Sequence, residues 1–352
     1  MIHVGPHKTG STHVQSSLLS LDDLIESRTN YIQPWGLGSN HKMQSFFSFE
    51  LQNLEATAFR YLNQLKNFLH NAHQQHHNVL ISSEELCSIP LDGASYLRNM
   101  VHNFQAKVVI IFRDSLSRAL SNYRQTYPWS SFSDKGPLSD FGAFVQIELE
   151  SIRNYYSYIL DMYAREFGVE SLVIIDYDGA IAAKKDLVYI ILCEICKILC
   201  QDLSQGLSPL LKREHIKMID DNRADSHISL SLAGVISEIR VSIQKKKKCM
   251  IPLVSHDKIT HFILSMIGKQ TLPSKTKNLS TIFHKETLIS DDIIRKKYNN
   301  QMLYNNRNAS IAAVERQVVT ELDFDRFRSD PYWRKWVHDV TSSLINSTII
   351  AC

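Results

Sequence analysis

The sequence predicts an α/β fold, in which helices flank a central, mainly parallel sheet to give three layers. One observation is the apolar run Lys107–Phe112, which is typical of a strand buried on both faces of a parallel sheet. A second is that similar runs, Val79–Leu86 and Ser171–Gly179, precede and follow it along the chain. A third is that helical patterns separate these runs, as in proteins whose strands alternate with crossover helices.

The first elements follow in order from the N-terminus. Met1–Gly5 is a short apolar strand that enters a glycine turn, and apolar residues spaced by three or four predict a helix from Thr12 onward. Residues 30–41 are expected to form a loop, because a proline and two glycines punctuate them. Residues 44–77 are expected to be helical.

Helical patterns dominate the rest of the chain. Residues 114–127 are expected to form a loop and a helix, and residues 141–168 to form one or two helices. From about residue 205 onward, polar interruptions break up the helical patterns, and no further strand is predicted. We therefore expect one domain over residues 1–352, with an α/β core in 1–205 and a mostly helical part in 206–352.

The composition is that of a globular protein. Of the 352 residues, 44% are hydrophobic and 21% are charged. A net charge of +3 argues against a nucleic-acid-binding protein, which would carry a clear basic excess. No apolar run is long enough to predict a membrane span, and the polar N-terminus does not fit a signal peptide. The expected location is the cytoplasm, or the Golgi lumen if the sequence is a fragment that lacks its anchor.

The cysteines predict neither a disulfide framework nor a metal site. The six are sparse, and Cys193, Cys196 and Cys200 lie in an apolar stretch with helical spacing and no further ligand pair nearby. We interpret them as buried thiols that pack as small hydrophobic side chains.

The stretch "VGPHKTGSTHVQ", residues 4–15, has the pattern of an anion-binding loop. A strand, a glycine turn and a helix N-terminus together point backbone N–H groups and the positive end of the helix dipole at a ligand. Gly5 and Gly10 permit a tight turn and a close approach to the anion. The loop also supplies a mobile cation and two hydroxyl groups, from Lys8, Ser11 and Thr12.

The loop departs from the phosphate loop of nucleotide triphosphatases. Their pattern is GxxxxGK[ST], and Gly5 and Gly10 have its spacing, but Ser11 stands where the pattern has lysine. No carboxylate for magnesium is evident directly after the third predicted strand, where Arg113 comes first. A site without a metal suits an anion that needs less neutralisation than a triphosphate. A nucleotide kinase or another NTPase stays as an alternative.

At these residues the sequence resembles the sulfotransferases that use 3′-phosphoadenosine 5′-phosphosulfate (PAPS), which have a P-loop NTPase-like fold. The first motif of that family is a strand followed by Lys-Thr-Gly-Ser/Thr-Thr, and "HKTGST" matches it. The resemblance implies that the loop cradles the 5′-phosphosulfate of PAPS, and His7 is a further candidate for contact with it. The residues implied are Lys8, Thr9, Gly10, Ser11 and Thr12.

A second motif of that family is an arginine at the end of a buried strand, with a serine eight residues later. Arg113 follows the third predicted strand, Ser121 has the required spacing, and Tyr123 completes a Ser-x-Tyr arrangement. The resemblance implies that Arg113 and Ser121 bind the 3′-phosphate of PAPS, which suits the planar fork of a guanidinium group. The alternatives are an ion pair of Arg113 with Asp114 or Glu85, and a serine with no special role.

Sulfuryl transfer requires the acceptor to lose a proton, so a general base is expected. Glu84 and Glu85 end the second predicted strand, and relatives that act on carbohydrates have a glutamate base after the corresponding strand. Glu84 is the first candidate and Glu85 the second, because consecutive residues that leave a strand point to opposite sides. Some relatives use histidine instead, which makes His41 the third candidate.

The resemblance implies a hydroxyl or amine acceptor on a carbohydrate or a small alcohol, with residues 206–352 covering its binding region. No nucleic-acid partner and no metal are expected. Lys245–Lys248 could attract an acidic acceptor or form a solvated charge run. A further alternative is a non-catalytic module of the same fold that binds adenosine phosphates. Several aromatic residues could line an acceptor pocket or simply pack: Tyr31, Trp35 and Tyr127–Trp129.

Overall fold

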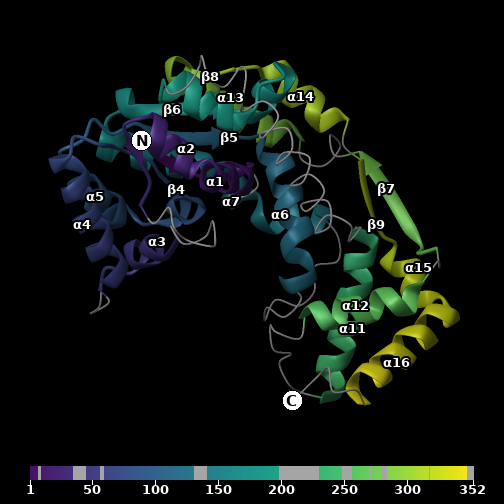
Figure 1. Cartoon of the computed structure of the whole chain (residues 1–352). Helices are drawn as coiled ribbons and strands as arrows, with labels where there is room; N and C mark the ends of the chain where they lie inside the picture. Colours follow the sequence, from purple (N-terminus) through teal and green to yellow (C-terminus); the bar gives the residue numbers. More distant parts are fainter. Residues whose placement is uncertain are drawn as a thin grey trace. The chain divides into compact units, whose positions relative to one another are not determined.

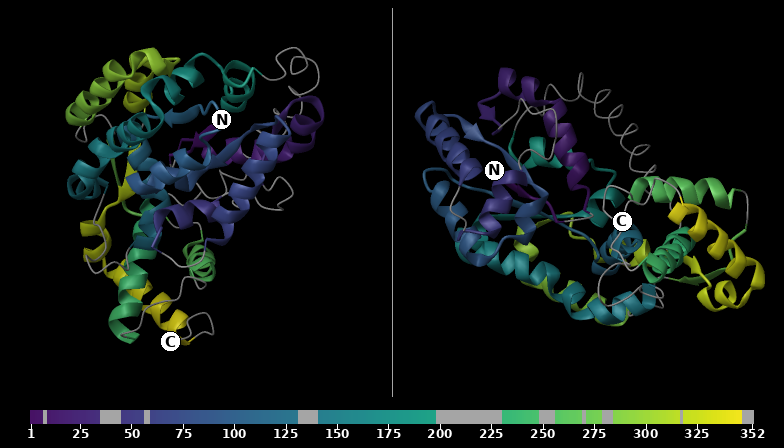
Figure 2. Two further views of the ribbon diagram at one scale, coloured as in Figure 1. Left: turned by 90° about the vertical axis from the view of Figure 1, so that its left-hand side faces the viewer. Right: turned by 90° about the horizontal axis from the view of Figure 1, so that it is seen from below.

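The computed structural model of the protein contains two compact units (Figure 1 and Figure 2). Unit 1 comprises Met1–Arg118, Arg153–Asp220 and Lys285–Ala313, and unit 2 comprises Ala119–Ile152, Asp221–His284 and Val314–Cys352. The structure describes residues 1–6, 9–34, 45–55, 59–130, 141–197, 230–247, 256–268, 271–278, 284–316 and 318–346.

Unit 1 is built on a five-stranded sheet with the order β4-β1-β5-β6-β8 (Figure 1). Every neighbouring pair of strands in it is parallel. The predicted α/β class with a parallel central sheet is therefore confirmed. The strands are β1 (Ile2–Val4), β4 (Ile81–Ser83), β5 (Val108–Phe112), β6 (Leu172–Asp176) and β8 (Met302–Leu303).

Side chains of β5 alternate between the two faces of the sheet. Val108 and Ile110 belong to one buried apolar cluster, whereas Val109 and Ile111 belong to another. A continuous apolar run is required here because both faces are covered. Each fully buried side chain of this size contributes about 1.5–3 kcal/mol to folding.

Helices cover one face of the sheet through residues at helical spacing. In α4, for example, Leu62, Leu65 and Leu69 are buried and recur every three or four residues. The helix expected over residues 44–77 is in fact two helices, α3 and α4. The helices that contribute to this cluster are α3 (Ser45–Gln52), α4 (Arg60–Gln74), α5 (Leu91–Met100), α7 (Phe141–Phe167) and α13 (His284–Lys297).

The other face is covered by elements that follow β1 and β6. Val14 and Leu18 of α1 pack in this second cluster, together with the buried thiols of Cys193 and Cys196. The interpretation of those two cysteines as packing residues is thus confirmed, and Cys200 lies outside the described residues. The elements here are α1 (Ser11–Ser20), α2 (Asp22–Arg28), α8 (Tyr177–Ala182), α9 (Leu187–Tyr189) and the π-helical turn η3 (Ile190–Ile195).

Short strands that the sequence does not predict complete unit 1. β2 (Tyr31–Ile32) pairs in parallel with β3 (Asn78–Val79). β8 joins the central sheet although it lies far beyond residue 205. Two-residue strands are too short to produce a readable pattern of alternation.

Unit 2 is mostly helical, as expected for the C-terminal part, but also holds a strand pair. β7 (Ser274–Asn278) and β9 (Val318–Leu322) pair antiparallel, with Ser274 opposite Leu322. Trp333 packs against Phe327 and Trp336 in its core, with ring centres 5.1 and 5.6 Å away. Its main helices are α11 (Leu230–Lys247), α12 (His256–Ile267), α15 (Phe324–Ser329) and α16 (Pro331–Asn346).

Helices α6 (Ser115–Ser130) and α14 (Arg307–Glu315) continue from unit 1 into unit 2, and α7 continues from unit 2 into unit 1. Within the part of the chain that the structure describes, no helix is both long and apolar enough to cross a membrane.

Candidate functional site

The carboxyl ends of four neighbouring strands meet at one edge of the sheet in unit 1. Val4 at the end of β1 pairs with Ser83 of β4 and with Ile110 of β5. Phe112 at the end of β5 pairs with Asp176 at the end of β6. Adjacent strands lie about 4.8 Å apart, so the segments that leave them are neighbours. These segments begin at Glu84, Gly5, Arg113 and Tyr177.

Gly10 forms the turn between β1 and α1. It precedes the helix with φ 85° and ψ 13°, a left-handed conformation that favours glycine. Among the described residues, no side chain caps the N-terminus of α1, and its first turn holds no acidic residue. The first N–H groups of a helix lack intrahelical partners, so this end of α1 can receive an anion.

Two hydroxyl groups hold the loop in shape. Thr9 Oγ1 donates a hydrogen bond of 2.6 Å to the carbonyl oxygen of Pro6, and Ser11 Oγ donates one of 3.2 Å to the same oxygen. Both side chains are buried. A Cβ atom on Gly5 would lie only 2.4 Å from Ser11 Oγ, so glycine is required there.

The loop rests on a buried polar layer between β1 and β4. The Gly5 N–H donates to the carbonyl oxygen of Ser83 at 3.2 Å, and the Gln15 amide donates to that of Ser82 at 3.4 Å. His3 Nδ1 lies 2.8 Å from Ser82 Oγ. Burial lowers the pKa of His3 to about 4, with a smaller opposing effect from the charge of Glu84. His3 is therefore neutral near pH 7.

Glu84 and Glu85 begin a short 3-10 helix, Glu84–Ser88, directly after β4. Both side chains are half-buried. Glu84 directly follows β4, which pairs with β1, and its charge opposes the lowering of the His3 pKa. The Glu85 backbone carbonyl accepts a hydrogen bond of 3.4 Å from the Gln52 amide.

Arg113 leaves β5 beside the loop. Its backbone N–H donates to the Tyr156 hydroxyl at 3.0 Å, and its guanidinium carbon lies 5.1 Å from the centre of the Tyr177 ring. Burial raises the pKa values of Asp178 and Asp114, and the charge of Arg113 opposes both shifts. Arg113 therefore lies near both carboxyl groups.

Tyr177 lies next to both halves of the candidate site. A Cβ atom on Gly10 would be 3.6 Å from Tyr177 Cε2 and 2.9 Å from Leu187 Cδ1. Since the same tyrosine ring neighbours the guanidinium of Arg113, a single side chain separates the loop from Arg113. The sequence analysis did not select Tyr177, because it lies inside the predicted strand Ser171–Gly179; in the structure the strand ends one residue earlier, at Asp176.

Several residues named from the sequence are outside the described part of the chain. These are His7, Lys8, Trp35 and His41, together with the side chains of Tyr127–Trp129. Thr12 is half-buried in the first turn of α1, and Tyr31 is half-buried in β2. Ser121 is half-buried on α6 and belongs to unit 2, whereas Arg113 belongs to unit 1.

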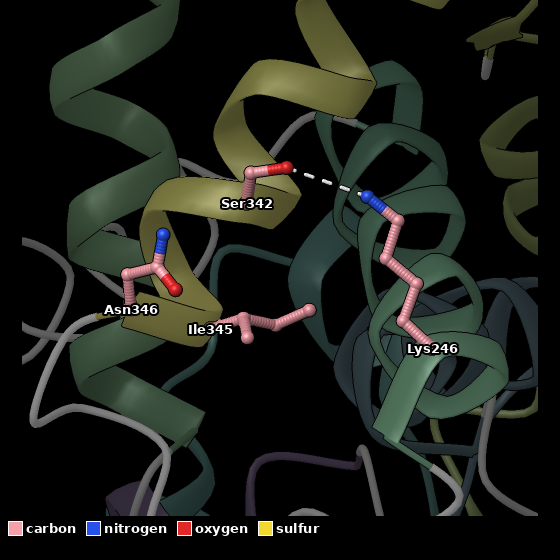
Figure 3. A pocket seen from close by; sticks show the side chains of 4 residues that line it. All are labelled: Lys246, Ser342, Ile345 and Asn346. Carbon is pink, nitrogen blue, oxygen red and sulfur yellow. Dashed lines mark hydrogen bonds between the residues drawn. The ribbon is translucent and has the colours of Figure 1, made fainter.

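The lysine run at the end of α11 belongs to unit 2. Lys245 and Lys246 are exposed, and Lys248 lies outside the described residues. The Lys246 ammonium donates a hydrogen bond of 3.3 Å to Ser342 Oγ on α16, as Figure 3 shows. It borders a pocket of about 230 Å³, whose other lining residues are Ser342, Ile345 and Asn346.

Comparison with family models, with curated proteins and with solved structures finds no match to this chain. The resemblance to the PAPS-dependent sulfotransferases therefore depends on its two sequence motifs.

Proposed function

We propose that this protein is a sulfotransferase that moves a sulfuryl group from PAPS to a hydroxyl or amine acceptor, such as a carbohydrate or a small alcohol. The observation that carries the proposal is the adjacency of two anion-binding elements. The Gly5–Gly10 loop and Arg113 follow neighbouring parallel strands, and the Tyr177 ring lies next to both. A nucleotide with phosphates at its 5′ and 3′ positions could use both elements at once.

The loop is proposed to bind the 5′ end of the nucleotide. The uncapped N–H groups of α1 and the positive end of its dipole suit the phosphosulfate. Lys8 precedes Gly10 by two residues and is proposed to neutralise the charge that develops on the leaving oxygen. Catalysis of in-line transfer by position and electrostatics needs no covalent intermediate on the protein.

Arg113 is proposed to bind the 3′-phosphate, whereas Ser121, which belongs to unit 2, stays a prediction from the sequence motif. Arginine binds phosphate through two parallel N–H donors, and the resulting charge-assisted bonds are about twice as strong as neutral ones. Arg113 directly follows β5, and its guanidinium carbon lies 5.1 Å from the centre of the Tyr177 ring, which also neighbours Gly10. P-loop NTPase-like character of the fold is part of the same proposal.

Glu84 is proposed as the base that accepts the proton of the acceptor, ahead of Glu85 and His41. It follows β4, the strand next to β1, so it leaves the sheet beside the loop. A base must lie within hydrogen-bond reach of the acceptor. The position of Glu84 directly after the strand that pairs with β1 supports this assignment.

Two rival functions use the same loop in other ways. A nucleotide kinase or NTPase would bind ATP with magnesium, but the loop has Ser11 in place of the expected lysine and Arg113 in place of an acidic residue after β5. A non-catalytic module would bind adenosine phosphates and transfer nothing. Binding and turnover measurements separate the three.

Thermal unfolding in the presence of nucleotides tests the binding step. A ligand that binds only the folded protein raises the melting temperature. Adenosine 3′,5′-bisphosphate is expected to raise it more than ATP with magnesium. A larger shift with ATP and magnesium would favour the NTPase and remove the proposal.

A screen of acceptors with sulfate-labelled PAPS tests the transfer step. Incorporation of label into at least one carbohydrate or alcohol is expected. Tight binding of the bisphosphate without transfer to any acceptor would favour the non-catalytic module.

A further inference from the structure

His13 and Asp186 form a contact beside the anion-binding loop that the proposed chemistry does not use. His13 is the third residue of α1, and its Nε2 lies 3.0 Å from Asp186 Oδ2. The side chains of His13 and Asp186 are 13% and 27% exposed, so water screens this pair only in part.

The two carboxylate oxygens of Asp186 have different partners. Oδ1 accepts hydrogen bonds from the backbone N–H groups of Val188 at 2.8 Å and Tyr189 at 3.2 Å, which caps the N-terminus of α9. Oδ2 faces His13. The carboxylate therefore joins the start of α9 to the first turn of α1.

The residue after Asp186 extends this connection to the glycine turn. Leu187 is buried, and its Cδ1 would lie 2.9 Å from a Cβ atom on Gly10. Asp186 and Leu187 thus contact the loop region at two points, one polar and one apolar. If α9 moved, the glycine turn at Gly10 and the first helical turn of α1 would both lose a contact.

The contacts of Asp186 keep its carboxylate ionised. Burial raises the pKa of Asp186, but the hydrogen bond and the charge of His13, together with the backbone N–H groups of Tyr189 and Val188, outweigh that effect and lower the pKa below its usual value. An ionised carboxylate is a strong hydrogen-bond acceptor, so it can hold the His13 ring against the start of α9.

We propose that Asp186 is a positioning residue, which acts through His13 and Leu187 to fix the Gly10 turn for the 5′-phosphate end of the nucleotide. This inference rests on the proposed function, because it concerns the same loop. The inference adds that Asp186 and Leu187 influence how tightly the loop binds the nucleotide, although neither residue touches the nucleotide.

Asp186→Asn is the sharpest test, because asparagine caps a helix as well as aspartate does. The variant keeps an oxygen for the Val188 and Tyr189 N–H groups and removes only the charge that faces His13. His13→Gln is the partner variant, since glutamine keeps a donor without a charge. Asp292→Asn is the matched control, because it neutralises an ion pair with Arg307 elsewhere in unit 1.

The readout is the Kd of each variant for adenosine 3′,5′-bisphosphate, adenosine 5′-phosphate and adenosine 3′-phosphate. Asp186→Asn is expected to weaken binding of the first two by roughly fivefold, the effect of about 1 kcal/mol, and to leave the 3′-phosphate unchanged. His13→Gln should weaken binding of the same two ligands. The double variant should bind them only slightly more weakly than Asp186→Asn alone, because both substitutions remove the same contact.

Each other outcome has a defined meaning. Equal weakening of all three ligands, or no weakening of any, would overturn the positioning role. Loss of binding in the Asp292→Asn control would also overturn it, because charge removal anywhere would then suffice. If the unsubstituted protein binds none of the three nucleotides, the proposed function itself fails, and the inference fails with it.

Discussion

Gly10 adopts a left-handed conformation, with φ at 85°, where the anion-binding loop enters α1. A methyl group on this residue would meet Leu187 at 2.9 Å and would strain the backbone. Gly10→Ala is therefore expected to lower the free energy of unfolding by roughly 2–4 kcal/mol, the sum of strain and crowding. It should also weaken binding of adenosine 3′,5′-bisphosphate.

Gly268→Ala is the matched control for Gly10→Ala. Gly268 also has a positive φ, 56°, but a Cβ atom there meets nothing within 4 Å. Urea titrations should give a smaller loss, about 1–2 kcal/mol from strain alone, with nucleotide binding unchanged. An equal loss of binding in both variants would contradict the role of the Gly10 turn.

Arg113 is expected to distinguish nucleotides by their 3′ group. Arg113→Ala should weaken binding of adenosine 3′,5′-bisphosphate by roughly tenfold to a hundredfold, the value of a charge-assisted hydrogen bond. Binding of adenosine 5′-phosphate should change little. Arg98→Ala is the control, because Arg98 likewise lies over an aromatic ring in unit 1, that of Phe167. Equal losses for the two nucleotides would remove the 3′ assignment.

Glu84 is expected to affect turnover rather than binding. Glu84→Gln removes the proton acceptor but keeps the size of the side chain, so the transfer rate should fall by roughly 10²- to 10⁴-fold. The Kd for the bisphosphate should stay within about twofold, in line with a group that acts only on the acceptor. The transfer rate and the Kd of Glu85→Gln are measured in parallel for comparison. Full activity of Glu84→Gln with loss of activity in Glu85→Gln would transfer the role to Glu85.

At the scale of elements, a pair of buried carboxyl groups joins α13 to the end of β5. Asp291 accepts hydrogen bonds from the Ser115 backbone at 3.0 Å and from Ser115 Oγ at 2.6 Å. Burial raises the pKa of Asp291 well above its usual value, and the charge of Asp114 raises it further. Burial also raises the pKa of Asp114. The folded state therefore favours a proton bound to the Asp114–Asp291 pair.

The sign of the resulting pH dependence follows from these raised values. The folded state binds protons more tightly than the unfolded state does, so this contribution is complete below an aspartate pKa of about 3.9 and is lost as pH rises above it. Asp291→Asn keeps an acceptor for Ser115 and cannot ionise. The change in the free energy of unfolding that this substitution causes should be more favourable at pH 8 than at pH 4.5, by about 1 kcal/mol.

Urea titrations at the two pH values measure this difference. Asp292→Asn is the control, because that partly exposed carboxylate is paired with Arg307 and its replacement should not stabilise the protein at pH 8. Greater destabilisation by Asp291→Asn at pH 8 than at pH 4.5 would contradict the buried-proton account.

Burial decided which elements could be predicted from the sequence. β1, β4, β5 and β6 are found as strands where apolar runs predict them, because both faces of the sheet are covered. β8 has only two residues, and its place in the sheet depends on contacts with β6 that no local pattern reveals. The break between α3 and α4 was likewise missed because polar and apolar residues keep a helical spacing on both sides of it.

At the scale of the whole molecule, the two compact units interleave along the chain. Residues 285–313 belong to unit 1, where Arg295 forms a buried ion pair with Asp176 at 2.5 Å. A charge pair separated by more than a hundred residues leaves no periodic signal in the sequence. Compact units of this kind are found only from contacts.

Some residues of the candidate site could be selected from the sequence, and others could be found only from the structure. Glu84, the Gly5–Gly10 loop and Arg113 could be selected because each directly follows an apolar strand, and ligands of such sheets bind at the carboxyl ends of the strands. Tyr177, His13 and Asp186 could not be assigned roles, since their relation to the loop depends on how α1 packs against α9.

The most direct test of the central claim is a calorimetric titration of the unsubstituted protein with adenosine 3′,5′-bisphosphate. The claim is that the loop and Arg113 hold opposite ends of one nucleotide. It predicts binding of one molecule per chain, without magnesium, at least tenfold tighter than either adenosine 5′-phosphate or adenosine 3′-phosphate. Equal affinity for the three nucleotides, or binding that requires magnesium and a triphosphate, would contradict it.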